Sequence, residues 1–382
     1  MRLDRRHFLG ATALAAAPRI LFAQAATERR FIFIIQRGAA DGLNTVIPYA
    51  EPAYASARGA LAIDSASALK LDGSFALHPS LAKLHALYGA GQASFFHAVA
   101  SPYRDRSHFD GQNVLETGGS APYQVRDGWM NRLLGVLPRG GRPAVAFSPG
   151  VPLALRGAIE VTSYAPSALP QPNEDLMLRV EQLYANDGQL HALWSAALEA
   201  RSMAGGMAGG AIRQDTAALG RIAAGFLVRG DGPRVAMIEM DGWDTHSGQN
   251  ARLATQLRGL DGLVGALQEG LGPVWAHTVV LVATEFGRTV AANGTGGTDH
   301  GTGAVAMLLG GAVQGGRIVA DWPGLAPKNL HEGRDLKPTM ALDALIVAAC
   351  SESFGVDPDR LKHVLFPHGA PVKALSPLLR AA

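Results

Sequence analysis

Residues 279–309, VVLVATEFGRTVAANGTGGTDHGTGAVAMLL, contain two short apolar runs separated by a polar, glycine-rich segment. The runs at 278–283 and 304–309 are short and bounded, which is typical of buried β-strands. The segment between them carries Glu285, Arg288, Asp299 and His300. Because open α/β sheets place their chemistry in loops beside strand ends, this stretch predicts one wall of a functional site.

Apolar runs and helix-like segments alternate along the rest of the chain. The run at 30–35 is continuously apolar after its arginine, as expected of a strand buried on both faces of a parallel sheet. Further strands are predicted at 93–99, 145–147 and 234–240. The clearest amphipathic helix lies at 252–271. This alternation predicts an α/β fold, a three-layer α/β/α sandwich with a mostly parallel sheet. Residues 174–227 are mostly helical around a Gly-Gly break and are predicted to be a helical insertion.

The first 25 residues have the pattern of an export signal. Arg5 and Arg6 precede a small-residue apolar run at 11–17, and Ala23-Gln24-Ala25 provides an A-x-A cleavage site. This order predicts a twin-arginine signal peptide, export by the twin-arginine translocase, and a periplasmic or secreted domain over 26–382. The alternative is an amphipathic N-terminal helix. No later apolar run reaches the roughly 18 residues needed to span a bilayer, so no membrane span is expected in the mature chain.

Composition excludes some partners. The formal net charge of +2 over 382 residues gives no broad basic field, so no nucleic-acid partner is expected. The single cysteine, Cys350, cannot form an internal disulfide and is expected to be a buried thiol.

Acidic and imidazole side chains follow or precede the predicted strands. Because the carboxyl ends of parallel strands share one edge of a sheet, these residues are expected to converge there. Carboxylates with several imidazoles suit a divalent metal ion, which would polarise an ester oxygen and activate a hydroxyl or water. The alternative is that each is an ordinary loop residue. The candidate ligands are Asp41, Asp244, His246, Glu285, Asp299 and His300.

A helix is expected to begin at Ser107, past the second predicted strand. Ser107 is a candidate nucleophile there, because free N–H groups at a helix N-terminus favour an alkoxide, and His108 is a candidate catalytic partner. The alternative is that Ser107 only caps the helix, with Asp110 three residues later. Candidate substrate-binding residues are Arg37, Asn44, Arg106 and Arg288. Guanidinium forks match tetrahedral oxyanions, although surface ion pairing is the alternative for these arginines.

Five motifs together resemble an uncharacterised family of exported proteins, domain-of-unknown-function family fifteen-hundred-and-one. In order they are RGAADGLN (37–44), SHFD (107–110), WDTH (243–246), EFGRT (285–289) and DHG (299–301). The resemblance extends from about residue 30 to the C-terminus. That family is similar to the alkaline phosphatase and sulfatase superfamily, whose members are α/β/α sandwiches with one or two metals at the strand carboxyl ends. The resemblance therefore implies an alkaline phosphatase-like fold and a metal-dependent hydrolase.

Individual roles follow from the same resemblance. It implies that Asp41 is the aspartate after the first strand, that Ser107 is the nucleophile, and that His300 is the last histidine ligand. The chain departs from the superfamily pattern at Phe286, which stands where a second histidine ligand is expected, and His108 is the candidate replacement. Asp244 and His246 are also closer in sequence than the usual pair, and Asp241 would give a longer spacing.

Three functions remain open from the sequence. The leading hypothesis is a periplasmic metal-dependent hydrolase of a small anionic phosphate or sulfate ester, with Zn, Mn, Ca or Mg as the metal. The second is a non-catalytic exported binding or assembly protein that retains the fold, which Phe286 motivates. The third is a hydrolase of another ester or amide class that uses metal-bound hydroxide instead of serine.

Overall fold

The computed structural model describes residues 28–138, 144–165, 174–185, 187–203, 215–369, 375 and 377–381. The predicted signal peptide at 1–25 lies outside these residues. The described chain is organised around a nine-stranded sheet in the order β11-β5-β10-β9-β1-β8-β6-β7, with β12 also pairing with β5. The strands are β1 (Arg30–Gln36), β5 (Ala93–Ala100), β6 (Ala144–Phe147), β7 (Thr162–Ser163), β8 (Val235–Met240), β9 (Thr278–Thr284), β10 (Ala304–Leu309), β11 (Arg317–Val319) and β12 (Met340–Ala341).

The sheet is mostly parallel, and one internal strand runs the other way. Strand β1 pairs in parallel with β8 and β9, whereas β10 is antiparallel to both β5 and β9. The start of β10 therefore lies at the same edge as the ends of its two neighbours. This reversal places the loop before β10 beside the loops that follow the parallel strands.

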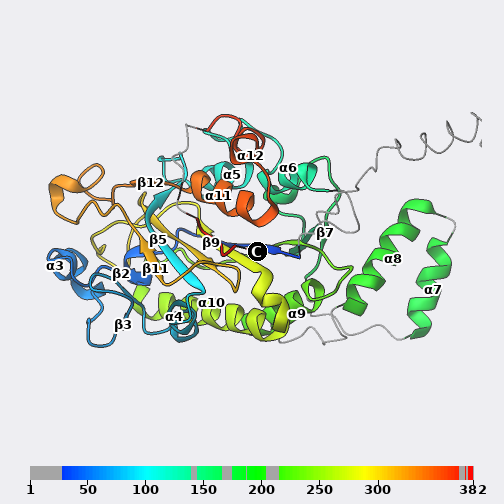
Figure 1. Cartoon of the computed structure of the whole chain (residues 1–382), viewed down its shortest axis with the longest axis horizontal. Helices are drawn as coiled ribbons and strands as arrows, with labels where there is room; N and C mark the ends of the chain where they lie inside the picture. The colour runs from blue at the N-terminus through cyan, green and yellow to red at the C-terminus, as the bar shows by residue number, and fades with distance from the viewer. Residues whose placement is uncertain are drawn as a thin grey trace, which may run out of the picture.

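Helices cover both faces of the sheet, which confirms the expected three-layer α/β/α sandwich (Figure 1). One layer contains α5 (His108–Thr117), α6 (Trp129–Val136), α11 (Leu342–Phe354) and α12 (Pro358–Leu365). The other contains α4 (Ala82–Gly89), α9 (Thr216–Leu227) and α10 (Gln249–Leu271). Side chains alternate between these layers along β1: Phe31 and Phe33 pack in the first core, and Ile32 and Ile34 in the second. Strands rich in apolar residues are favoured because neither face meets water.

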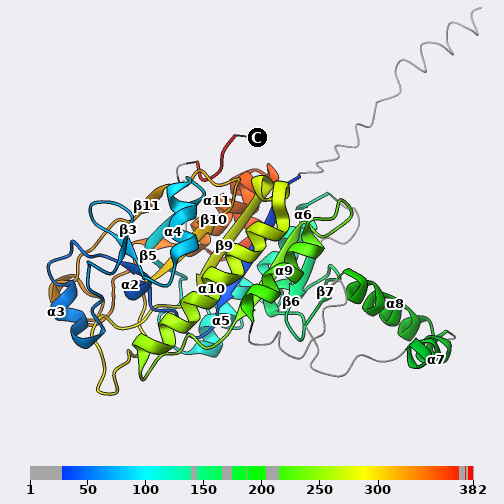
Figure 2. The ribbon, with the colours of Figure 1, turned by 90° about the horizontal axis from the view of Figure 1, so that it is seen from below.

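The predicted helical insertion contains two different structural parts. Helices α7 (Glu174–Tyr184) and α8 (Gly188–Met203) form a hairpin that stands away from the sandwich (Figure 2). Helix α9, which lies within the same predicted segment, instead packs along α10. The sandwich layer therefore includes the last part of the segment.

A second, smaller sheet lies between β1 and α4 in the sequence and has no counterpart in the sequence prediction. It has the order β2-β4-β3, with β2 (Val46–Ile47), β3 (Leu69–Lys70) and β4 (Ala76–Leu77). Helices α2 (Gly42–Thr45) and α3 (Tyr54–Arg58) belong to the same region. These elements are too short to produce a recognisable period in the sequence.

The buried imidazole of His97 in β5 links the two sheets. Its Nε2–H donates to the Val46 carbonyl at 2.9 Å, and its Nδ1 accepts the Ala98 N–H at 2.9 Å. Both nitrogens are thus used by the neutral ring. Burial lowers the pKa of His97 to about 4, so this histidine has a structural role.

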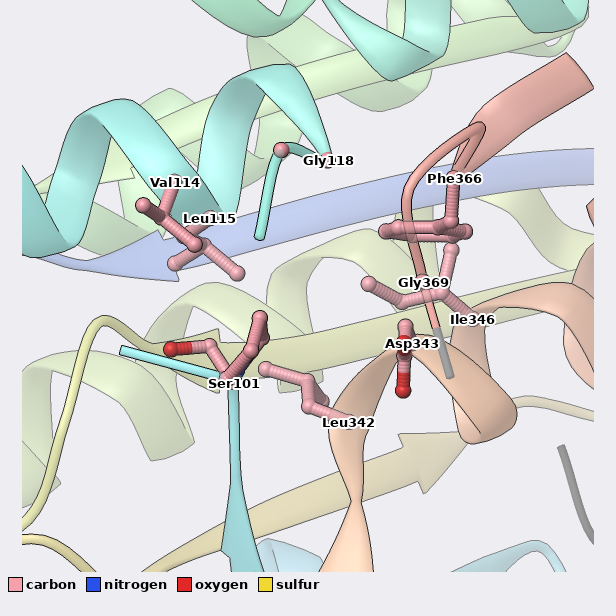
Figure 3. Close-up of a pocket in the computed structure, with 11 residues that line it drawn as sticks. Ser101, Val114, Leu115, Gly118, Leu342, Asp343, Ile346, Phe366 and Gly369 are labelled. Carbon is pink, nitrogen blue, oxygen red and sulfur yellow. The ribbon is translucent and has the colours of Figure 1, made fainter. Parts of the chain in front are cut away.

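A small, mostly apolar pocket lies between α5, α11 and the segment after α12 (Figure 3). Its one acid, Asp343, accepts the Ala344 N–H at 2.9 Å, and burial raises the pKa of this carboxyl group. No predicted site residue lines this pocket. It is therefore separate from the chemistry that the sequence motifs indicate.

Two further expectations concern single features. Cys350 is a buried free thiol in α11, and burial raises its pKa. Among the described helices, none combines the length and the apolar character needed to cross a bilayer.

Candidate metal centre

Loops at one edge of the sheet bring the candidate residues together. His108 begins α5 after β5, Asp244 and His246 follow β8, Glu285 follows β9, and His300 precedes the antiparallel β10. Gly38, after β1, has φ of 116°, and a Cβ there would lie 2.6 Å from the Asp244 backbone nitrogen. Only glycine permits this close approach of the β1 and β8 loops.

Four side chains form the centre of the cluster. Ligand atoms of His108, Asp244 and His300 all lie within 4.8 Å of one another. His246 extends this group, with its Nε2 3.1 Å from Asp244 Oδ1 and 3.0 Å from His300 Nε2. Three imidazoles thus surround one carboxylate, an arrangement that could hold a metal ion, and we refer to these four residues as the metal centre.

Each imidazole of the metal centre has an acceptor at its other nitrogen. Nδ1 of His108 lies 2.8 Å from Glu285 Oε1, and Nδ1 of His246 lies 3.1 Å from Asp299 Oδ1. Nδ1 of His300 lies 2.8 Å from the Arg106 carbonyl oxygen. These acceptors assign the N–H to Nδ1 in all three rings, which leaves each Nε2 to face the cluster. Metal-binding histidines are oriented by such outer contacts.

Of the three Nε2 atoms, that of His108 has no hydrogen-bond partner, and those of His246 and His300 lie against each other. His108 Nε2 is buried and makes no hydrogen bond to the described residues, the nearest acid oxygen being Asp244 Oδ2 at 3.5 Å. The Nε2 atoms of His246 and His300 would present lone pairs to each other across 3.0 Å. A cation between them removes this repulsion. The donor set, three imidazole nitrogens and a carboxylate, fits a divalent transition metal.

Glu285 supports His108 and is itself fully buried. Its Oε1 accepts from Gly38 N at 2.8 Å, from His108 Nδ1 and from Gln112 Nε2 at 3.1 Å. Burial acts to raise the pKa of Glu285, but the hydrogen bonds, led by that from His108, hold it below its ordinary value. The same contact raises the pKa of His108. Glu285 therefore occupies the position of an orienting carboxylate behind an imidazole.

Asp244 is held ionised by Arg288, whose Nη1 donates to Oδ1 at 2.5 Å. Burial acts to raise the pKa of Asp244, but the hydrogen bond and charge of Arg288 outweigh it and lower that pKa. Burial also lowers the pKa of His300, which favours the neutral, ligating ring. Asp299, behind His246, has a lowered pKa because Asn293 donates a hydrogen bond to it.

Phe286 forms an apolar wall of the metal centre. Its ring is buried, stacks on His108 at 5.1 Å between ring centroids, and lies 5.3 Å from the His300 ring. The side chain at the position expected for a histidine therefore packs against two other histidines and limits their rotation.

Two predicted site residues after β1 do not join the metal centre. Asp41 caps α2, forms a buried ion pair with Arg58, and accepts from Gln249 Nε2 at 2.5 Å. Asn44 is buried, donates to the Leu61 carbonyl at 2.8 Å and accepts from the Tyr54 hydroxyl at 3.0 Å. Their polar atoms are used within the protein.

The three predicted substrate-binding arginines are also bound to protein groups. Arg37 pairs with Glu116 and Glu239, and Arg106 pairs with Asp335 and Glu332. Arg288, besides Asp244, donates from Nε to Thr298 Oγ1 at 2.9 Å, and its side chain is 1% exposed. None of these guanidinium groups is available without breaking an ion pair.

Ser107 precedes α5 as its N-cap residue, but its side chain makes no capping hydrogen bond. The Ser107 side chain therefore does not form the capping box that was the alternative to a nucleophile. Its backbone N–H donates to the Tyr103 hydroxyl at 3.1 Å. The residue is half-buried directly beside His108, where the sequence placed a nucleophile.

The sequence prediction missed residues that hold the centre from behind. Gln112 bridges Glu285 and Arg37, accepting from Arg37 Nη1 at 2.9 Å. It lies four residues after His108 on α5, so helical spacing could have identified it. The Arg106 carbonyl could not have been identified, because backbone positions leave no side-chain signal.

The family model described as "Protein of unknown function (DUF1501)" matches residues 28–365, so the chain belongs to that family. No curated protein matches it. Among solved structures, the chain is similar to Ps i-CgsB in complex with k-i-k-neocarrahexaose, with a TM-score of 0.42 and 12% identity over 88% of this chain and 74% of that one.

Two further solved structures are similar to the chain. The C-terminal periplasmic domain of EcEptC from Escherichia coli has a TM-score of 0.39 and 11% identity, over 92% of this chain and 90% of that one. The phosphonate monoester hydrolase of Agrobacterium radiobacter has a TM-score of 0.39 and 13% identity, over 91% and 79%.

Proposed function

We propose that this member of the DUF1501 family is a divalent-metal-dependent hydrolase of phosphate or sulfate esters. The observation that carries the proposal is the arrangement of His108, His246 and His300. Each ring has an acceptor at Nδ1, and each turns Nε2 toward Asp244. Metal-binding histidines typically donate the N–H of their other ring nitrogen to an acceptor, and all three rings have such an acceptor here.

The donor set narrows the choice of metal. Calcium and magnesium prefer sites made only of oxygen atoms, whereas imidazole suits zinc and other transition metals. We therefore favour zinc, held by His108, Asp244, His246 and His300, and manganese, which prefers oxygen ligands more strongly, is the second candidate. Bound there, the metal would polarise an ester oxygen and lower the pKa of a hydroxyl or water.

The protein groups around the metal have separate roles in this proposal. Glu285, Asp299 and the Arg106 carbonyl keep the three histidines in the ligating tautomer. Phe286 excludes water from one side of the rings. Ser107, at the N-terminus of the ten-residue helix α5, is the proposed nucleophile, because free backbone N–H groups stabilise a developing alkoxide.

Metal analysis of the purified chain tests the proposal most directly. We expect about one equivalent of zinc or manganese, and chelator should remove both the metal and the hydrolysis of 4-nitrophenyl esters. The His300→Ala variant should bind the metal at least tenfold less tightly than the wild type. The control variant His363→Ala, which removes an imidazole of α12 outside the centre, should bind the metal as tightly as the wild type. Metal content below a tenth of an equivalent after incubation with both metals would refute it.

A periplasmic location is part of the same proposal. It rests on the twin-arginine pattern at Arg5 and Arg6, which lies outside the described residues. Replacing both arginines by lysine should retain the precursor in the cytoplasm, as shown by fractionation. Unchanged export of that variant would remove the twin-arginine route.

The second candidate is a non-catalytic binding protein. Phe286 favours it, because a phenyl ring replaces a histidine ligand beside the centre. This candidate predicts metal binding without hydrolysis over a broad ester panel. Metal-dependent turnover that is lost in Ser107→Ala would exclude it.

A further inference from the structure

The charged groups around the metal centre carry information about the substrate. We propose that the reacting group is a tetrahedral ester with a single negative charge, such as a sulfate monoester or a phosphate diester, and not a phosphate monoester dianion. This inference rests on the proposed hydrolase function and specifies its substrate.

The metal centre and its direct supports carry little net charge once a metal is bound. Their carboxylates are Asp244, Glu285 and Asp299, and the guanidinium of Arg288 pairs with Asp244. Arg334 donates only to the His300 backbone carbonyl and is paired with Asp335. The three carboxylates and Arg288 leave two formal negative charges, which one divalent cation cancels. An incoming anion therefore meets a nearly neutral centre.

Two other arginines connected to the centre, Arg37 and Arg106, are each paired with two carboxylates. Arg37, linked to Glu285 through Gln112, lies between Glu116 and Glu239. Arg106, whose carbonyl orients His300, directs its guanidinium to Asp335 and Glu332. Both side chains are less than a fifth exposed. Binding a dianion through either fork would require breaking an existing ion pair, which removes much of the gain.

Further acidic side chains lie close in sequence to residues of the metal centre. Asp105 and Asp110 lie within three residues of His108, and Asp241 lies three residues before Asp244. Asp105 and Asp241 are exposed, and Asp110 is half-buried. Their potential opposes a second negative charge on the substrate more strongly than the first, because Coulomb energy scales with ligand charge.

Matched esters with one leaving group test this inference. The probes are 4-nitrophenyl sulfate and methyl 4-nitrophenyl phosphate, each with one charge, and 4-nitrophenyl phosphate, a dianion at pH 8 because its second pKa is about 6. With metal-loaded protein, kcat/KM for the better monoanion should exceed that for the dianion by about tenfold or more. Equal or faster turnover of the dianion would overturn the inference and leave the hydrolase proposal intact.

A binding measurement separates the inference from catalysis. Calorimetry with the metal-loaded chain should show tighter binding of the methyl ester of phenylphosphonate than of phenylphosphonate itself, which is doubly charged at pH 8. Absence of turnover for every ester would count against the hydrolase proposal, whereas tighter binding of the dianion would count against the charge preference.

Two variants that each remove one negative charge test whether electrostatics causes the preference for a monoanionic substrate. Glu332→Gln removes one carboxylate that neutralises Arg106 and should raise relative kcat/KM for the dianion about twofold to threefold. Glu269→Gln makes the same charge change near the far end of α10, roughly 30 Å along the helix from Gln249. Equal selectivity in the two variants would refute the electrostatic explanation.

Discussion

Replacing Glu285 by glutamine removes the negative charge behind His108 while preserving the shape of the side chain. The carboxylate accepts three hydrogen bonds at Oε1, and its Oε2 accepts from Thr284 Oγ1 at 3.0 Å. A glutamine oxygen can take the Oε1 position, because the Thr284 hydroxyl also lies 2.8 Å from the Gln36 carbonyl and can donate there instead. The fold should therefore tolerate the change.

The expected effect is on metal affinity. A neutral amide no longer favours positive charge on the His108 ring, so His108 Nε2 becomes a weaker donor. Outer-contact substitutions of this kind typically cost about 10–100-fold in metal affinity, or about 1.4–2.7 kcal/mol. We expect Glu285→Gln to weaken zinc binding within that range.

Competition against a chromophoric chelator at pH 7.5 measures the zinc affinity, and urea denaturation of the metal-free chain checks folding. Glu116→Gln is the matched control, because Glu116 is also a buried carboxylate but contacts Arg37 and the Ala154 N–H instead of an imidazole. Zinc affinity of Glu285→Gln within about twofold of wild type, or an equal loss in the control, would refute the orienting role.

Three further predictions concern Arg106, His97 and Ser107. Arg106→Ala frees the backbone segment, φ 62°, whose carbonyl orients His300, so zinc affinity should fall about tenfold; Arg104→Ala, in the same loop but bound to local carbonyls, should leave it unchanged. His97 has a folded pKa of about 4 against about 6.5 unfolded, so only the unfolded chain takes up this proton as pH falls from 6.5. Stability should fall between pH 6.5 and 4 by about 3 kcal/mol from this group, and urea titrations of His97→Gln should show a shallower pH slope than wild type. Ser107→Ala should lower kcat at least about 10³-fold with zinc content unchanged, and full activity would remove this residue as nucleophile.

The sequence specified most strands of the main sheet, because burial on both faces favours segments rich in apolar residues. The runs at 30–35, 93–99, 234–240 and 278–283 became β1, β5, β8 and β9, and the three-layer architecture was confirmed. The family resemblance was also confirmed. The small sheet β2-β4-β3 escaped prediction because two-residue strands carry no period.

For the candidate site, the sequence indicated which residues converge but not the part that each one plays. The sequence placed acids and imidazoles at strand ends, but it could not distinguish a ligand from the group that orients a ligand. Glu285 and Asp299 contact imidazoles at Nδ1, whereas Asp41 pairs with Arg58 away from the metal centre. His108, first considered a catalytic partner, lies within the centre. The roles of all these residues remain predictions until metal is measured.

The stretch at 279–309 illustrates what tertiary structure alone decided. Its two apolar runs specify two strands, but their relative direction depends on partners elsewhere in the chain. Because β10 runs antiparallel between β5 and β9, His300 meets His108 and Asp244 at one edge of the sheet. A parallel β10 would have placed His300 at the opposite edge. Strand direction is a property of long-range pairing, and so is every contact that turns three separate histidines into one centre.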